Sequence, residues 1–378
     1  MLNGLDEVDW SRLTHAYGTA GDVPDQLRAL ASSDAGDRGK ALKQLYGNIY
    51  HQGTVYKATA HAVPFLLEVL AAGIERREVL ELLVAIVTGY DENWLPGGLP
   101  VAQNRRLAAG GDAVLAAGPQ PGDEDFDEDE GNSDYLYGLD EDDQARVFAH
   151  FWVTAYDAVR AGVPLFRSLL DVEPVMAAYA LAWFPEEAPG SLRALAEVTG
   201  DDAAVAAASV AIGLLGGRPV VALGDPRPLA RWGAAIALAG PDAADDVVEE
   251  LLTVAAGSLG RTEEVPFLDG DLAGYAALAL RQTGDRHADR VFDVLVARLP
   301  GLTGLAVFPV LREVLRLAFP DGALTPGTPY TALDSRQRRI VEALTGIEGI
   351  WLVNLNEHLR AYGLPTEKEA LRAYASTR

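Results

Sequence analysis

The chain contains no cysteine, so disulfide bonds and thiolate-ligated metal sites are both excluded. It also lacks an uninterrupted apolar run of about eighteen residues, the length that a membrane-spanning helix requires. The first residues carry neither the basic nor the apolar region of a secretory signal peptide. A chain without these features is expected in the cytoplasm, where thiols stay reduced and no covalent staple forms.

Lysine is scarce, with only four residues, and arginine supplies nearly all of the positive charge. The 55 acidic residues outnumber the 31 basic ones, which gives a net charge of −24. Residues 123–143 contain twelve acidic side chains and no basic one, so this stretch holds half of the net charge. Nucleic-acid affinity comes mainly from Lys and Arg side chains that meet phosphates. We therefore expect no direct nucleic-acid partner and instead a basic protein, which such a field attracts.

A short pattern recurs along the chain, in which an acidic or Gly-Asp turn is followed by an apolar, alanine-rich helix. The pattern begins at Asp34, Asp171, Asp201 and Asp225. Self-similarity at a short period is typical of a solenoid, because one such unit cannot bury its own apolar face and has to stack on a neighbour. With 49% hydrophobic residues, the chain has ample material for a folded core. No alternating run of β-branched residues is bounded by turns, so no strand is predicted.

These patterns predict an all-α protein, an α-solenoid of helix pairs in a single curved array with a long acidic insertion. A short helix is expected at residues 8–17, a later helix is expected to start at Pro64, and another is expected at residues 351–361. The expected regions are an N-terminal cap with the first repeats at 1–117, an acidic flexible insertion at 118–143, central repeats at 144–304 and a C-terminal helical capping region at 305–378.

Several segments resemble an actinobacterial family of HEAT-repeat proteins whose function is uncharacterised. The segments that carry the resemblance are WSRLTHAYG at 10–18, ALKQLYGNIYHQGTVY at 41–56, AHAVPFLLE at 60–68, GVPLF at 162–166, WFPEEA at 183–188 and WLVNLNEHLRAYGLP at 351–365. The similarity spans most of the chain and implies that the helix pairs are HEAT-like. HEAT repeats in general are binding scaffolds, so the resemblance implies binding by analogy and indicates no reaction.

Residues 46–56 form the most unusual segment, because polar and aromatic side chains crowd between two expected helices. Loops of this kind lie along one edge of a solenoid and often face a ligand. The candidate binding residues in it are Tyr46, Asn48, Tyr50, His51, Gln52 and Tyr56. The imidazole of His51 could act as an acid or base near neutral pH. Alternatively, these groups cap helix ends and fix a turn. Trp94 joins the candidates because its Pro/Gly-rich loop could line a groove.

The sequence contains no catalytic or metal-binding signature. His15, His51 and His61 lack the paired spacing of metal ligands on one helix. The acidic run resembles an EF-hand loop only superficially, since Leu136 stands where a bidentate glutamate is required. Ser11 and His15 would lie one turn apart on the expected N-terminal helix, but no oxyanion loop completes a triad. We expect no metal and no cofactor.

The acidic run supplies a second candidate surface, centred on Asp127, Glu128, Asp129 and Glu130. Such a run is usually a solvated, mobile loop, although it could also mimic phosphate toward a basic partner. These observations favour a protein-binding scaffold, or an inhibitor or immunity-type protein, that engages a basic partner through its concave face and acidic loop. The alternative is an uncharacterised enzyme with a small-molecule pocket near the N-terminal loops. Binding is favoured over catalysis.

Overall fold

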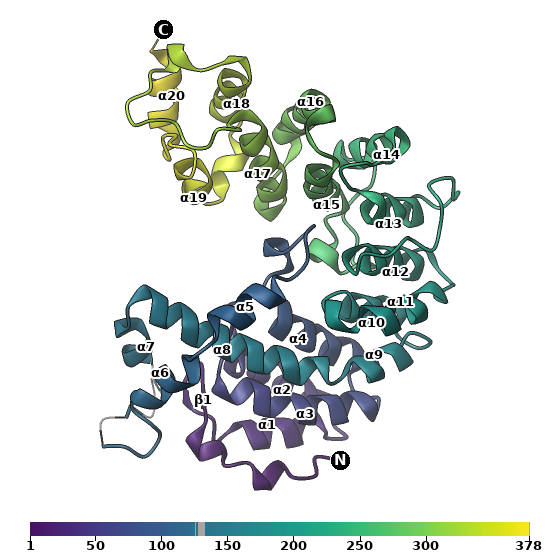
Figure 1. Ribbon diagram of the computed structural model, residues 1–378, viewed down its shortest axis with the longest axis vertical. Helices are drawn as coiled ribbons and strands as arrows, with labels where there is room; N and C mark the ends of the chain where they lie inside the picture. Colours follow the sequence, from purple (N-terminus) through teal and green to yellow (C-terminus); the bar gives the residue numbers. More distant parts are fainter. Residues whose placement is uncertain (125, 128–132, 378) are drawn as a thin grey trace. The chain divides into compact units, whose positions relative to one another are not determined.

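In the computed structural model, residues 1–124, 126–127 and 133–377 are described, and these residues form twenty α-helices joined by loops and short 3₁₀ turns (Figure 1). The prediction of an all-α protein is confirmed. The chain divides into two compact units. The first is Met1–Thr199 with Leu214–Gly216, and the second is Gly200–Gly213 with Gly217–Arg378.

The helices of the first unit are α1 Val23–Leu30, α2 Ala35–Asn48, α3 Lys57–Ala71, α4 Arg76–Thr88, α5 Val101–Leu107, α6 Gly111–Ala117, α7 Ser133–Gly138, α8 Glu141–Arg160, α9 Val163–Ser168, α10 Pro174–Leu181 and α11 Ala188–Ala196. The long α8 packs against α3, α4, α5 and α6 and so forms the centre of this unit. Trp152 on α8 donates its indole N–H to the Val87 carbonyl of α4 at 2.8 Å, which ties these two helices together.

Sheet within the described residues is confined to two antiparallel pairs of very short strands. These strands are β1 Thr14–His15, β2 Gly18–Thr19, β3 Tyr50–His51 and β4 Thr54–Val55. The prediction that the chain has no strand is therefore wrong. Strands of two residues are shorter than any alternating pattern that a sequence can display, and the turn between them carries most of the signal.

The prediction of an N-terminal helix at residues 8–17 is also wrong. Two 3₁₀ turns, Leu5–Glu7 and Trp10–Arg12, precede strand β1 instead. The buried Trp10 side chain donates its indole N–H back to the Leu5 carbonyl at 2.9 Å, and its ring lies 6.2 Å from that of Phe65. This tertiary contact folds the segment tightly against α3 and prevents a continuous helix.

Helix α3 begins at Lys57, not at Pro64 as expected, and the proline lies inside it. The side chain of Thr59 accepts the Tyr56 N–H at 2.8 Å, which satisfies a backbone donor at the true start of the helix. Ala62 and Val63 are fully buried beside the proline. Packing of this apolar face outweighs the loss of the backbone bond that the proline cannot donate.

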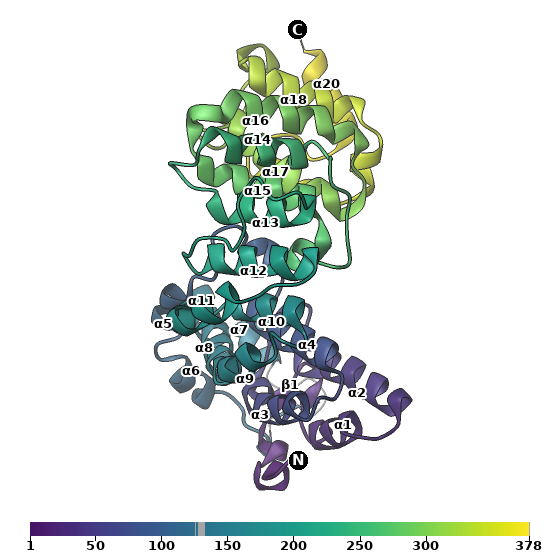
Figure 2. The ribbon, with the colours of Figure 1, turned by 90° about the vertical axis from the view of Figure 1, so that its right-hand side faces the viewer.

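The second unit contains α12 Asp202–Leu214, α13 Pro228–Leu238, α14 Asp245–Ala255, α15 Leu272–Ala279, α16 Ala288–Arg298, α17 Val307–Ala318, α18 Ser335–Gly346, α19 Asn356–Arg360 and α20 Lys368–Ser376. Successive helices lie side by side (Figure 2), with α14 packed on α13 and α15, and with α17 packed on α16 and α18. The helix expected at residues 351–361 is broken into a 3₁₀ turn, Gly349–Leu352, and the short α19. The indole N–H of Trp351 donates to the Leu344 carbonyl at 2.9 Å and holds this break against α18.

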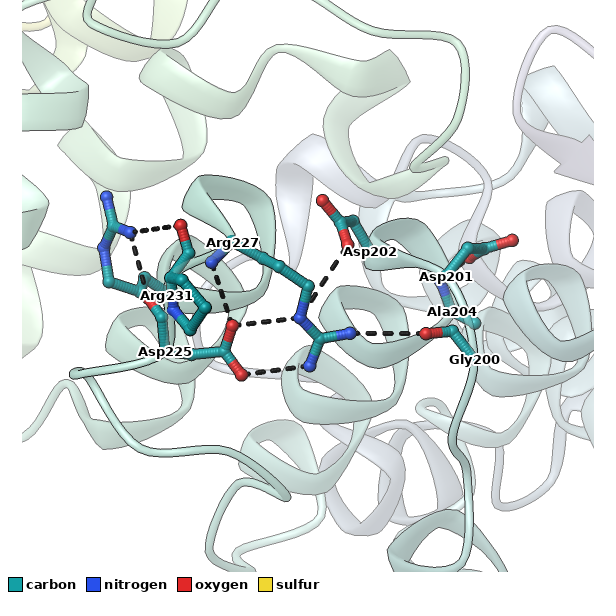
Figure 3. A network of polar contacts seen from close by, with 8 residues as sticks. Gly200, Asp201, Asp202, Ala204, Asp225, Arg227 and Arg231 are labelled. Carbon is teal, nitrogen blue, oxygen red and sulfur yellow. Dashed lines mark hydrogen bonds and ion pairs between the residues drawn. The ribbon is translucent and has the colours of Figure 1, made fainter.

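A polar network fixes the starts of α12 and α13 (Figure 3). Asp201 accepts the Ala204 N–H at 2.8 Å and so caps α12. Arg227 makes a bidentate pair with Asp225, at 2.9 and 3.0 Å, and also donates to the Gly200 carbonyl at 3.3 Å. The hydrogen bonds from Arg227 lower the pKa of Asp225 to about 2. Two of the acidic residues that mark the recurring pattern therefore act at helix starts.

Helices α12 and α13 approach closely because small residues face each other between them. A Cβ atom at Gly233 would lie 2.6 Å from the Ala206 carbonyl oxygen, which is closer than van der Waals contact permits. The neighbouring Trp232 is fully buried and donates its indole N–H to the Leu272 carbonyl at 3.0 Å. The alanine-rich composition thus serves close helix packing. Across the described part of the chain, no helix combines the length and the apolar character that crossing a membrane would take.

Candidate functional site

The segment singled out at residues 46–56 forms the end of α2 and the hairpin β3–β4. In this hairpin Tyr50 pairs with Val55 and His51 pairs with Thr54, which leaves Gln52 and Gly53 at the turn. Both turn residues have positive φ, 49° and 86°. A two-residue turn with two positive φ angles is the type I′ arrangement, whose twist matches that of the paired strands. Gly53 adopts this conformation at no steric cost, whereas Gln52 is strained in it.

The hairpin β1–β2 lies beside β3–β4. The Ala16 N–H at its turn donates to the Asn48 carbonyl at 3.0 Å, just before β3 begins. The hydroxyl of Tyr17 lies 3.3 Å from Nδ1 of His51, and the two rings meet edge to face at 5.3 Å. The two short hairpins therefore form one structure, although 34 residues separate these side chains in sequence.

Asp22 is the polar centre beneath this structure. It accepts hydrogen bonds from His15 Nε2 at 2.9 Å, from Gln26 at 2.7 Å and from Asn48 at 2.8 Å. Nδ1 of His15 accepts the Tyr17 N–H at 3.1 Å, so in the neutral ring the proton sits on Nε2 and points to Asp22. Burial raises the pKa of Asp22, but the hydrogen bonds and charge from His15 outweigh it, and the pKa is lowered.

Tyr46 and Tyr50 support the hairpin from within. Their rings meet edge to face at 6.0 Å, and the Tyr50 hydroxyl donates to the Gly89 carbonyl at the end of α4 at 2.9 Å. Burial, with the charge of Glu81, raises the pKa of Tyr46, and burial raises the pKa of Tyr50 to about 12. Both phenols therefore stay neutral. These two tyrosines pack within the hairpin and tie it to the end of α4.

Three other tyrosines of the first unit present their rings to solvent. Tyr17, Tyr90 and Tyr137 are 56%, 52% and 73% exposed. Tyr90 lies against the turn, since a Cβ atom at Gly53 would be 2.9 Å from its ring. The sequence did not single out Tyr17 and Tyr90 as candidates; each lies next to a glycine in its loop.

Tyr56 connects this group to the acidic segment. Burial, with smaller contributions from the nearby phenols of Tyr137 and Tyr17, raises the pKa of Tyr56 to about 12. Tyr137 belongs to α7, which lies within the acidic stretch. We call Tyr17, His51, Tyr56, Tyr90 and Tyr137 the tyrosine surface. Within the first unit, residues 46–56 and the acidic stretch are thus close enough for Tyr56 and Tyr137 to interact electrostatically.

The acidic stretch was expected to be a flexible loop. Helix α7 instead occupies part of it. The Tyr135 hydroxyl donates to the Val114 carbonyl of α6 at 2.8 Å, and Gln144 donates to the Leu136 carbonyl at 3.0 Å. Leu136 is buried, so α7 also contributes an apolar side chain to the interior. Asp127 is exposed, and the other predicted acidic site residues, Glu128, Asp129 and Glu130, lie outside the described residues.

Trp94 follows the 3₁₀ turn Asp91–Asn93 and is half-buried. Its indole N–H donates to the Thr88 carbonyl at 2.5 Å, next to the Gly89 carbonyl that holds Tyr50. The end of α4 therefore positions both this tryptophan and the β3–β4 hairpin. The indole N–H is already used internally, which leaves Trp94 a supporting role for the tyrosine surface.

The polar groups nearby do not assemble into a catalytic constellation. The Ser11 hydroxyl donates to Asp9 at 2.6 Å, whereas His15 turns to Asp22 and is only 4% exposed at its side chain. Neither residue lies on the helix expected there. Among the residues that the structure describes, no group of three or more His, Asp or Glu side chains is placed to hold a metal ion.

Comparisons with known proteins yield no relative: no protein-family model matches the chain, and no curated protein and no solved structure shows significant similarity to it.

Proposed function

We propose that this protein is a binding module, built on a HEAT-like α-solenoid, that holds a basic partner protein through the tyrosine surface and the adjoining acidic stretch. An inhibitor or immunity-type protein that neutralises a basic target in the cytoplasm is a concrete form of this function. Serial packing of neighbouring helices, such as α13, α14 and α15, supports the solenoid part of the proposal.

The exposure of Tyr17 and Tyr90 beside one hairpin, with the exposed Tyr137 within electrostatic range of Tyr56, carries the proposal. Tyrosine is enriched at the centres of protein interfaces, because its ring contributes a large contact area and its hydroxyl a hydrogen bond. The first hairpin holds Tyr17, the end of α4 holds Tyr90 and α7 holds Tyr137, so little backbone entropy is lost when a partner binds.

The charge of the neighbouring stretch specifies the partner's chemistry. Residues 123–143 carry twelve acidic side chains and no basic one, and α7 brings this stretch to the tyrosine surface through Tyr137. A one-sign field of this kind accelerates association with a basic surface and weakens as salt is added. The tyrosines would then supply the apolar contact that keeps the partner bound.

The alternative, an enzyme with a small-molecule pocket near the N-terminal loops, gains less support. Both nitrogen atoms of His15 are engaged in internal hydrogen bonds. Two cavities, of about 660 and 650 Å³, are lined entirely by residues of the second unit. A catalytic base needs a free nitrogen, and His15 has none.

Capture of partners from the native lysate tests the proposal with matched variants. We expect proteins of high isoelectric point to bind the wild type at low ionic strength. Tyr17→Ala with Tyr137→Ala should release them, and so should Asp127→Asn, Glu128→Gln, Asp129→Asn and Glu130→Gln together. A control that removes exposed apolar side chains elsewhere, Val172→Ala with Leu305→Ala, should retain them. Equal recovery by all four proteins at low and high salt would refute the proposed surface.

A further inference from the structure

The second unit contains a cavity of about 660 Å³ at the C-terminal end of α17. Its lining includes the charged side chains of Asp285, Arg316 and Arg336 and the aromatic side chains of Phe319 and Tyr362. The volume lies in the range of small-molecule sites, which combine apolar walls with a few fixed polar groups. This combination differs from the tyrosine surface of the first unit and belongs to other elements.

A buried carboxylate fixes one arginine of the cavity. Glu313 on α17 is fully buried and accepts a hydrogen bond from Nε of Arg316 at 2.8 Å and another from Nε of Arg281 at 2.9 Å. A buried carboxylate is tolerated only when it is paired and hydrogen-bonded, so this geometry is strongly specified. Two arginines share one glutamate, which leaves one positive charge in the cluster.

Arg316 keeps donors available to a ligand. Its Nε is engaged by Glu313, whereas its two terminal Nη groups have no hydrogen-bond partner among the residues that the structure describes. The side chain is 35% exposed and lines the cavity. A guanidinium whose terminal nitrogens are open and whose orientation is fixed matches the planar, two-oxygen geometry of a carboxylate.

Arg336, the second arginine that lines the cavity, uses its guanidinium for contacts within the protein. Nη1 of Arg336 on α18 donates to the Leu317 carbonyl at 3.2 Å, and Nη2 pairs with Asp289 on α16. The guanidinium also lies 5.6 Å from the ring centre of Phe292. Arg336 therefore joins α16, α17 and α18 around the cavity and leaves Arg316 as the anion-binding group.

The apolar wall is aromatic. The rings of Phe319 and Tyr362 lie 5.4 Å apart with an angle of 35° between their planes. Phe319 is buried and Tyr362 is half-buried, so the phenol ring is the one that a ligand can contact. Burial, assisted by the charge of Glu313, raises the pKa of Tyr362 and keeps its hydroxyl protonated. Asp285 stands exposed at the rim and repels additional negative charge.

We propose that this cavity binds a small aromatic monocarboxylate, with the carboxylate on the Nη groups of Arg316 and the ring beside Tyr362. The single excess positive charge of the Arg281, Glu313 and Arg316 cluster favours one negative charge on the ligand, and Asp285 disfavours two. The site is independent of the partner-binding surface, so either assignment can fail without the other.

Titration calorimetry of the full chain with 2-naphthoate tests this site, with 2-naphthamide as a neutral ligand of the same shape. We expect the naphthoate to bind and the amide to bind at least about tenfold more weakly, because hydrogen bonds to charged groups are the strong ones. Arg316→Gln should weaken naphthoate binding about tenfold or more by the same argument. Arg290→Gln, whose side chain pairs with Glu249 on the surface, should leave binding unchanged.

A second variant, Asp285→Asn, tests the site independently of whether Arg316→Gln folds. Asp285→Asn changes an exposed rim residue, so the fold should persist, and loss of its repulsion should strengthen naphthoate binding about threefold. Circular dichroism of every variant checks the helical fold. The proposal is overturned if neither compound binds the wild type, if both bind equally, or if Asp285→Asn weakens binding of the naphthoate.

Discussion

The imidazole of His15 and the carboxylate of Asp22 lie 2.9 Å apart, and this contact anchors the first hairpin to the start of α1. The same carboxylate accepts the side-chain amides of Gln26 and Asn48, so three segments of the chain converge on one residue. His15 and Gln26 are buried, which makes the carboxylate their necessary partner. The tyrosine surface therefore depends on a group that does not itself belong to it.

Asp22→Ala should destabilise the protein by about 2 kcal/mol, because buried donors of His15 and Gln26 lose their acceptor. Chemical denaturation followed by circular dichroism measures the loss. Asp25→Ala is the matched control: this residue pairs with Arg28 on the surface and is 85% exposed at its side chain, so its removal should cost less than about 1 kcal/mol. Equal losses in the two variants would mean that Asp22 does not organise the hairpins.

Acid should remove the contribution of Asp22 in a defined direction. The pKa of this carboxyl is lower in the folded state than its ordinary value of 3.8, so ionised Asp22 stabilises the fold above pH of about 4. That contribution is lost as the pH falls through the lowered pKa. The stability difference between the wild type and Asp22→Asn should therefore be constant near neutrality and shrink below pH of about 4. A difference that grows on acidification would contradict this assignment.

Gly233→Ala should destabilise the second unit by about 1–3 kcal/mol, because its methyl group would overlap the Ala206 carbonyl and force α12 and α13 apart. Gly39→Ala provides the comparison, since this glycine also lies within a helix but has open space around it. Gly39→Ala should increase the free energy of unfolding by about 0.5–1 kcal/mol. Thermal melting of both variants distinguishes close packing from helix propensity. Stabilisation by both would show that the helices have room to adjust.

The turn between β3 and β4 should respond oppositely to two substitutions. Gln52→Asn should stabilise by an amount on the order of 0.5 kcal/mol, because asparagine tolerates positive φ better than glutamine. Gly53→Ala should destabilise by about 1–2 kcal/mol, since its Cβ meets both the unfavourable φ and the Tyr90 ring. Denaturant midpoints report both changes. The type I′ assignment is wrong if Gly53→Ala is neutral.

Local chemistry determines the starts of two helices, α2 and α12. Asp34 accepts the Asp37 N–H at 3.0 Å and Asp201 accepts the Ala204 N–H at 2.8 Å, so the acidic residue before these two helices is a helix cap. A cap acts over three residues and is visible in the sequence. The same signal does not establish repetition, because unrelated helices use the same cap.

The errors arose where distant residues decide the local structure. Pro64 resembles a helix start, yet the buried face of α3 carries the helix through it. Residues around Trp10 resemble a helix, but contact with Phe65 favours 3₁₀ turns. Neither contact partner can be identified from the segment itself.

The candidate site was predicted in part. Residues 46–56 stood out by composition, and the structure places them in the hairpin that organises the surface. Tyr17 and Tyr90 come from separate segments, and only the fold brings them to that hairpin and Tyr137 within electrostatic range of Tyr56. Their convergence depends on long-range contacts, which residue composition does not encode.

Site-specific photocrosslinking at Tyr17 tests the central proposal most directly. A benzophenone amino acid at this position, irradiated in the native lysate, should form a covalent adduct with a protein of net positive charge, and adduct formation should fall as ionic strength rises. The same label at Val172, which is 55% exposed in the first unit, should give no such adduct. The account predicts a salt-sensitive basic adduct at Tyr17 alone. Equal adducts at both positions, or none at Tyr17, would contradict it.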